Sequence, residues 1–219
     1  MDVYPVSFVR KQHEYADVYS YFFTKEGVEY IAGQYTHLKI GEERDRAMVR
    51  ELSFASAPHE DGLCFTMHIG SQTPFKTAID VLEPGENAYL FKIKNDIEVN
   101  VDAGRPIVFV AGGVGVTPFR SMLMSLHQQG KSANTTLLQV QRGDFLFNED
   151  FTEAVATYVQ SAPEDFKAKL ETIVHQTENG QYYVCGSDRF IEAAKLYLSN
   201  AGVADAQVSI EYFTKQARV

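Results

Sequence analysis

Residues 106–123, PIVFVAGGVGVTPFRSML, combine three structural signals in one stretch. The apolar, β-branched beginning predicts a buried strand. Three glycines follow it: Gly112, Gly113 and Gly115. They allow positive φ angles and a close approach of a ligand to the backbone. Thr117 and Pro118 then predict a helix start, whose free N–H groups attract phosphate. A strand, a glycine turn and a helix in this order predict a pyrophosphate site, with a plain tight turn as the alternative.

The tripeptide Thr-Pro-Phe occurs a second time, at residues 73–75. An apolar residue recurs at i, i+3, i+4 and i+7 after it, which predicts a short helix over residues 74–82. Two such helix starts indicate two anion sites, because each helix N-terminus carries about half a positive charge. Two capped helices without any ligand are the alternative interpretation.

The rhythm of the chain changes near residue 100. Before it, short alternating runs broken by turns predict six strands of a small antiparallel β-barrel. These runs are residues 3–9, 15–23, 28–40, 49–57, 63–69 and 87–93. After it, apolar strands alternate with helices, which predicts a parallel sheet. The expected strands are 106–113, 135–140, 170–175, 181–187 and 207–213, and the expected helices are 118–129, 148–160 and 188–200. We therefore expect two domains, residues 1–103 and 104–219.

Composition excludes several classes of protein. The chain has 219 residues and a formal net charge of -9, and its lysines and arginines are dispersed, which disfavours nucleic-acid binding. Its longest nearly uncharged apolar run, residues 106–116, has about half the length that a membrane-spanning helix needs. The first residues lack the pattern of a signal peptide. We expect a cytoplasmic protein with no membrane span and no metal site, since two cysteines and dispersed histidines offer no ligand cluster.

Two further segments carry chemistry. RELSFASAP at residues 50–58 places Arg50 and Leu52 on one face of a strand and Glu51 and Ser53 on the other. An arginine beside serines can hold a phosphate, and an ordinary surface strand is the alternative. YYVCGSDRF at residues 182–190 ends a buried strand at Cys185, before a helix capped by Ser187 or Asp188. Because parallel strands end at one edge of a sheet, this turn should face the same site as the glycine turn.

In combination these motifs resemble the ferredoxin-NADP+ reductase superfamily, in particular its stand-alone flavin-binding oxidoreductase modules. The resemblance covers nearly the whole chain. Its motifs, in family order, are AGQY (32–35), RELSFASAP (50–58), TPFK (73–76), GGVGVTPFRSM (112–122), VCGS (184–187) and EYF (211–213). It implies a flavin-binding barrel in residues 1–103 and an NAD(P)-binding α/β domain in residues 104–219.

By this resemblance the first domain binds FAD, or FMN. Arg50 would bind the flavin phosphate, Ser53 would hydrogen-bond near flavin N5, and Thr73 would cap the helix that faces the phosphate. Leu52 stands where the family has an aromatic residue on the flavin ring, which removes stacking of about 1 kcal/mol. The loop at residues 92–99 also lacks the glycines of the family motif.

The resemblance also implies the nicotinamide site. The residues implied to bind the dinucleotide are Gly113, Gly115, Thr117, Pro118 and Gly186. Cys185 would adjoin the nicotinamide, and Glu211 would lie near the flavin edge as a proton relay, so that Ser53, Cys185 and Glu211 form the catalytic set. Arg142 matches a position that meets the adenosine ribose or its 2'-phosphate, and Phe147 would flank the adenine.

The activity implied is electron transfer from NAD(P)H through the flavin to a separate acceptor, such as a ferredoxin, a flavodoxin or an oxygenase component. Two alternatives stay open. A free-flavin reductase fits the loss of stacking at Leu52, and a degenerate nucleotide-binding module without turnover fits both departures. A dihydroorotate-dehydrogenase-type subunit is disfavoured, because two cysteines cannot hold its iron–sulfur cluster.

Overall fold

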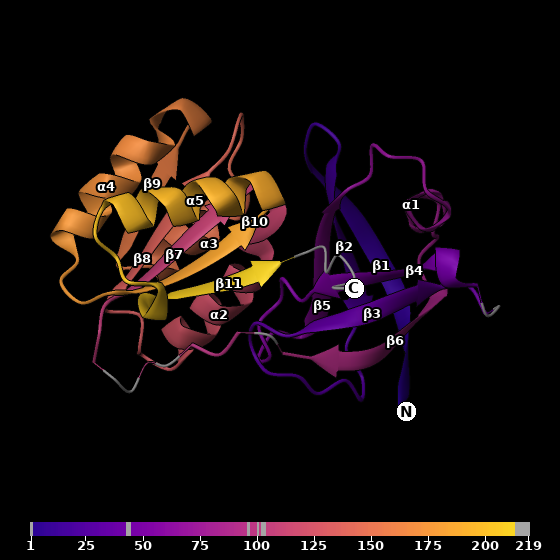
Figure 1. The fold of residues 1–219 in the computed structure, drawn as a ribbon. Coiled ribbons are helices and arrows are strands. Elements are labelled where there is room, and N and C mark those ends of the chain that lie inside the picture. Colours follow the sequence, from indigo (N-terminus) through magenta and orange to yellow (C-terminus); the bar gives the residue numbers. More distant parts are fainter. Residues whose placement is uncertain (1, 43–44, 96, 100, 102–103, 213–219) are drawn as a thin grey trace. The chain divides into compact units, whose positions relative to one another are not determined.

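The computed structural model describes residues 2–42, 45–95, 97–99, 101 and 104–212. The contacts divide the chain into two compact units, Met1–Asp96 and Ile97–Val219, which are drawn in Figure 1. The boundary expected after residue 103 lies outside the described residues and stays a prediction.

The first unit is a six-stranded antiparallel sheet. Its strands are β1 (Val3–Tyr15), β2 (Val18–Thr24), β3 (Tyr35–Ile40), β4 (Val49–Ser53), β5 (Gly62–His68) and β6 (Asn87–Lys94). They lie in the order β4-β3-β6-β1-β2-β5, so both ends of the order are edge strands. The expected antiparallel fold is confirmed, although the strand expected at residues 28–40 begins only at Tyr35.

The segment after β4 connects the two ends of this sheet. Phe54 N donates to Gln34 O at 3.0 Å, and Ala55 N donates to Cys64 O at 2.8 Å. Through these bonds, the segment after β4 contacts both the residues before β3 and the edge strand β5. The sheet therefore curves into a half-barrel, with β4 and β5 near each other. The interior is filled by alternating residues of the strands, such as Tyr21 and Phe65, because side chains alternate between the two faces of a strand.

A short α-helix packs on the core of the first unit. Helix α1 (Pro74–Asp80) buries Phe75 and Ile79 in the same cluster as the strand residues. Each fully buried side chain of this size contributes about 2–3 kcal/mol of hydrophobic free energy. The helix predicted from the apolar spacing at residues 74–82 is therefore confirmed, two residues shorter at its end.

The second unit is a five-stranded parallel sheet with helices. Its strands are β7 (Ile107–Gly112), β8 (Thr135–Val140), β9 (Thr157–Ser161), β10 (Gln181–Gly186) and β11 (Val208–Tyr212). Its helices are α2 (Thr117–Gln128), α3 (Asn148–Ala154), α4 (Phe166–Gln176) and α5 (Asp188–Asn200). The order β11-β10-β7-β8-β9 places β7 at the centre, with the glycine turn at its carboxyl end. The expected α/β fold is confirmed.

Helices pack on both faces of the parallel sheet. On one face, α4 and α5 share a core with alternate residues of the strands, including Val108 and Val184 (Figure 1). On the other face, Phe109 of β7 lies 4.9 Å from Phe119 of α2, measured between ring centroids. Because both faces are covered, the central strand β7 is apolar throughout, as the sequence pattern indicated.

Two of the expected elements were wrong. The helix expected over residues 148–160 ends at Ala154, and Thr157–Ser161 forms the edge strand β9, paired with β8. The strand expected at residues 170–175 lies within α4 instead. Phe166, Leu170 and Ile173 are its buried residues, at i, i+4 and i+7, which is the spacing of one helix face.

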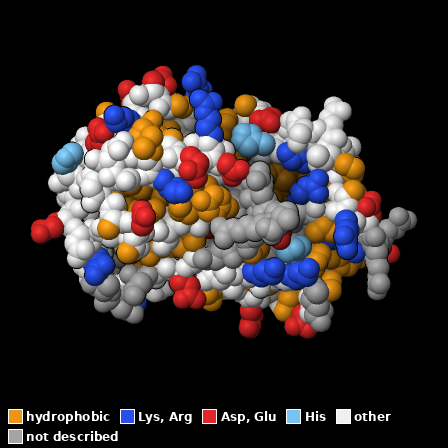
Figure 2. Space-filling model, viewed as in Figure 1, with side chains coloured by type: hydrophobic (Ala, Val, Ile, Leu, Met, Phe, Trp, Pro, Cys, Tyr) orange, Lys and Arg blue, Asp and Glu red, His pale blue; other side chains and the backbone are white. Residues whose placement is uncertain are grey.

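Among the helices of the described residues, none has the length and apolar character required to cross a membrane. Charges of both signs mix on the surface: Figure 2 shows Lys and Arg side chains among Asp and Glu side chains on the visible face. In the part of the chain that the structure describes, no group of three His, Cys, Asp or Glu side chains is placed to hold a metal ion.

Candidate functional site

The glycine turn at the end of β7 contains two glycines with different surroundings. Gly113 has a φ angle of 54°, and a Cβ built there has no heavy atom within 4 Å. A Cβ at Gly115, in contrast, would overlap the carbonyl oxygen of Cys185. Gly113 therefore leaves open space beside the backbone, as a ligand site requires, whereas Gly115 is required by the packing of β10 against the turn.

Thr117 does not cap α2 in the way that the sequence indicated. The N-cap position is Val116, and Thr117 is already the first helical residue. Its Oγ1 donates to Val114 O at 2.9 Å instead of accepting a bond from the helix. Pro118 lies in the first turn, as expected. No side chain caps α2, but the Thr117 N–H is bonded to Val114 O and Pro118 has no N–H, so the start of α2 offers an anion the positive end of its helix dipole.

Cys185 and Glu211 face each other at the carboxyl edge of the sheet. They are paired in the register of β10 and β11, and Cys185 is also paired with Ala111 of β7. Both side chains are buried. Burial raises the pKa of the Cys185 thiol well above its usual value, and the Glu211 carboxylate raises it further. The thiol is therefore neutral at neutral pH, beside the glycine turn.

Phe190 is a residue of this edge that the sequence did not reveal. A Cβ at Gly112 or Gly186 would lie within 2.6 Å and 2.7 Å, respectively, of Phe190 ring atoms. The ring also stacks on Phe166 at 4.8 Å between centroids. Phe190 N donates to Ser187 Oγ at 3.3 Å, so Ser187 rather than Asp188 is the N-cap of α5. Gly186 thus allows an aromatic side chain to pack over the strand ends.

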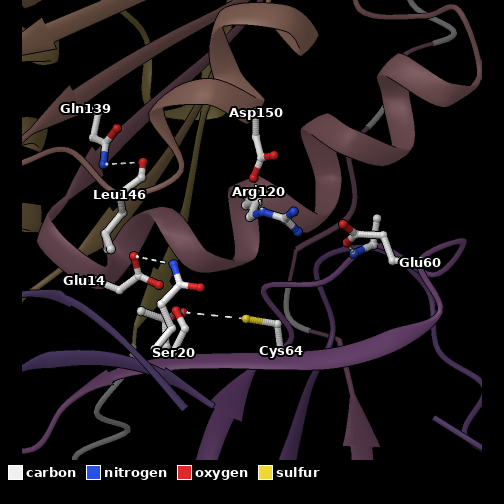
Figure 3. A network of polar contacts seen from close by, with 11 residues as sticks. Glu14, Ser20, Glu60, Cys64, Arg120, Gln139, Leu146 and Asp150 are labelled. Carbon is white, nitrogen blue, oxygen red and sulfur yellow. Dashed lines mark hydrogen bonds and ion pairs between the residues drawn. The ribbon is translucent and has the colours of Figure 1, made fainter. Parts of the chain in front are cut away.

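The loop after β8 is held by amide side chains. Gln139 Nε2 donates to Leu146 O at 3.3 Å (Figure 3), and Gln141 Nε2 donates to Asp144 O. Arg142 is exposed between these two anchored points. Arg142 is therefore an exposed cation on a loop that two side-chain hydrogen bonds anchor.

Arg120 of α2 follows the Thr-Pro-Phe tripeptide of residues 117–119, and its side chain already has two partners. Its Nε lies 2.6 Å from Asp150 Oδ2, and Figure 3 shows the two side chains directed toward each other. Its guanidinium also lies 5.1 Å from the ring centroid of Phe147. Phe147 has a φ angle of 56°, which is unusual for a bulky residue. The Arg120–Phe147–Asp150 contacts therefore fix the start of α3.

In the first unit, Arg50 and the start of α1 are brought together. The Arg50 guanidinium lies 5.6 Å from the ring centroid of Phe75, and its Nη1 donates to Val49 O at 2.6 Å. Thr73 is the N-cap of α1, and its Oγ1 accepts a bond from Lys76 N at 3.4 Å. The expected cap is confirmed, and the arginine lies beside the first helical turn.

Leu52 and Ser53 occupy the end of β4. Leu52 is half-buried and packs on the core of the first unit, on the same side as Arg50. Ser53 is buried opposite Tyr35. On the face of β4 opposite to Arg50 and Leu52, Glu51 Oε1 lies 3.0 Å from His37 Nε2. Burial lowers the pKa of His37 despite this carboxylate.

The segment at residues 92–99, which lacks the glycines of the family motif, begins with an unusual backbone conformation. Lys92 has a φ angle of 53°, so a lysine adopts the left-handed conformation in a segment without glycine. Phe213, the last residue of the EYF motif, lies outside the described residues.

Residues 109–196 match the family model described as "Oxidoreductase NAD-binding domain". A flavohemoprotein of Bacillus cereus is 25% identical over 240 residues, which cover 94% of this chain and 60% of that protein. Oxidoreductase NdmD of Pseudomonas putida is 27% identical over 114 residues, covering 50% of this chain and 19% of that protein. The chain thus spans about 60% of the length of the flavohemoprotein that it matches.

Solved structures share the fold of the whole chain. The FAD/NAD-binding domain of a nitric oxide dioxygenase from Vibrio cholerae has a TM-score of 0.75 at 22% identity, covering 94% of this chain and 98% of that one. A ferredoxin NADP+ reductase from Neisseria gonorrhoeae, with bound FAD and NADP, has a TM-score of 0.72 at 16% identity, covering 97% and 99%. The Amycolatopsis cytochrome P450 reductase GcoB has a TM-score of 0.78 at 18% identity, covering 97% and 70%.

The chain has the fold of solved ferredoxin-NADP+ reductases. The segment that matches the NAD-binding family model, residues 109–196, lies in the second unit. The resemblance seen in the sequence is confirmed at this level.

Proposed function

We propose that this protein is an NAD(P)H-dependent flavoprotein oxidoreductase that passes electrons through FAD to a separate acceptor. The observation that carries the proposal is the meeting of the open glycine turn, Cys185 and Glu211 at one edge of the parallel sheet. The glycine turn and Cys185 lie within residues 109–196, which match the NAD-binding family model, and Glu211 lies after them. Ligands of open parallel sheets bind at the carboxyl ends of the strands.

The first unit supplies residues that fit a flavin phosphate. The Arg50 guanidinium lies over the ring of Phe75, beside the helix start that Thr73 caps, so a phosphate there would meet a cation and the positive end of a helix dipole. When bound, the flavin would take up a hydride and release its electrons to the acceptor. We favour FAD because the Neisseria gonorrhoeae reductase holds FAD, and FMN is the alternative.

In the second unit, the chain's own residues would bind and orient the nicotinamide dinucleotide. Gly113 leaves the space for the pyrophosphate, and the positive end of the α2 helix dipole would attract it. The neutral thiol of Cys185 would border the nicotinamide without adding charge. Glu211, buried beside it, would hold or release a proton. In the first unit, Ser53 would hydrogen-bond the flavin near N5.

We further propose a preference for NADPH. Arg120 is paired with Asp150, whereas Arg142 is exposed on the anchored loop after β8 and can meet a 2'-phosphate. Replacing Arg142 by Ala should raise the KM for NADPH about tenfold and leave the KM for NADH unchanged. Equal effects on both KM values would remove Arg142 from this role.

The acceptor is proposed to be a separate protein. Structural neighbours include reductase parts of cytochrome P450 systems, such as GcoB. Free flavin is the second candidate acceptor, because Leu52 packs on the core and offers no aromatic face to hold the flavin ring. The cytoplasmic location expected from the sequence stays a prediction.

The test of the flavin site is a double substitution. Arg50→Ala with Thr73→Ala should release the flavin from the purified protein while its far-ultraviolet circular dichroism stays unchanged. Arg46→Ala is a matched control, since Arg46 is exposed in the preceding turn and should keep the flavin. Unchanged flavin occupancy in the double variant would contradict the assignment.

A further inference from the structure

Asp17, in the hairpin between β1 and β2, holds three successive residues of another segment. Its Oδ1 lies 3.0 Å from His68 Nδ1, and its main-chain O accepts a bond from Ile69 N at 2.8 Å. Its Oδ2 accepts a bond from Gly70 N at 3.0 Å. One residue thus fixes the end of β5 and the beginning of the connection that follows it.

Gly70 is matched to this carboxylate. A Cβ at Gly70 would overlap Asp17 Oδ2 and would lie 3.2 Å from Asp17 Cγ. The φ angle of Gly70 is not in the left-handed region, so an alanine there is opposed by the carboxylate rather than by backbone strain. Glycine at this position therefore allows the close approach of Asp17.

The segment held by Asp17 leads directly to Thr73. Ser71 O accepts a bond from Thr73 N at 2.8 Å, and Lys76 Nζ donates to Ser71 Oγ at 2.7 Å. At the other end of α1, Lys11 Nζ lies 2.9 Å from Asp80 Oδ1. Contacts from β1 and from its hairpin with β2 therefore fix both ends of the segment formed by residues 69–80.

We propose that Asp17 is a positioning residue for the flavin phosphate, because it holds residues 68–70 and thereby places Thr73 beside Arg50. This inference rests on the proposed flavin site. Asp17 does not touch the phosphate. It acts by fixing the segment before binding, so that less ordering accompanies the binding of the flavin. The hydrogen bond from His68 lowers the pKa of Asp17, so its carboxylate is ionised at neutral pH.

The test is a double-mutant cycle on flavin affinity, measured by titrating the apoprotein with FAD. Asp17→Ala should weaken FAD binding about tenfold, because both side-chain bonds to residues 68 and 70 are lost. Asp17→Asn keeps an acceptor oxygen and should restore most of the affinity. Gly70→Ala should weaken binding in the presence of Asp17 but add nothing in the Asp17→Ala background. Asp61→Ala, an exposed carboxylate of the same unit, is the control.

Riboflavin separates positioning of the phosphate from a general loss of structure, since it carries no phosphate. Its affinity should be the same in the wild type and in Asp17→Ala. Additive effects of Asp17→Ala and Gly70→Ala, or equal losses for FAD and riboflavin, would overturn the inference. If the wild type binds FAD and Asp17→Ala binds it equally well, only the role of Asp17 fails. If the wild type binds no FAD, the proposed function fails with it.

Discussion

Gly113 and Gly115 lie in the same turn, and the structure gives them different tasks. A side chain at Gly113 meets nothing within 4 Å, whereas one at Gly115 meets the main chain of β10. The sequence placed both in the nucleotide site, since glycine spacing alone does not distinguish space for a ligand from space for a neighbouring strand. The prediction that this turn binds a ligand therefore depends on Gly113 and not on Gly115.

These tasks predict different effects of the same substitution. Gly113→Ala should cost about 1 kcal/mol of unfolding free energy, because alanine is strained at positive φ, and should raise the KM for NAD(P)H. Gly115→Ala should cost about 2 kcal/mol or more through overlap with Cys185 O. Urea unfolding and steady-state kinetics measure the two effects. A larger stability loss at Gly113 than at Gly115 would contradict this description.

Other residues show where the sequence was sufficient. Thr73 caps its helix as predicted, but Thr117, in the same tripeptide, is already inside its helix and donates to Val114 O. The difference comes from the turn of 3-10 helix before Thr117, which depends on the packing of the glycines. Phe190 was missed because its role depends on two glycines of separate strands.

At the scale of elements, long and regular patterns were predicted best. Helix α5 and strand β8 have the expected bounds, Asp188–Asn200 and Thr135–Val140. Residues 157–160 were assigned to a helix and residues 170–175 to a strand, because short runs fit both periods. There the pairing with β8 and the burial of one face of α4 against the sheet decide the structure.

The start of α5 gives a prediction at this scale. Ser187 Oγ accepts the bond from Phe190 N, so Ser187→Ala should cost about 1 kcal/mol of unfolding free energy. Ser187→Asn should restore most of it, since asparagine is an equally good cap. Thermal unfolding measures both variants. No loss in Ser187→Ala would mean that Asp188 or water replaces the cap.

At the scale of the whole molecule, the sequence predicted both folds and their order along the chain. The resemblance rested on six short motifs, and the family match and solved structures confirm it at the level of the fold. The identity of the proposed acceptor was not predictable, because a fold does not specify a partner. The chain spans about 60% of the matched flavohemoprotein, so its acceptor is a matter for direct measurement.

We propose above all that NAD(P)H reduces a flavin held by this chain. The most direct measurement is to load the purified protein with FAD, remove oxygen, mix it rapidly with NADPH or NADH, and record the visible flavin absorbance. We predict that the flavin bands disappear in a rapid first turnover, faster with NADPH than with NADH. An unchanged flavin spectrum with both nucleotides would contradict the account and favour a binding module without turnover.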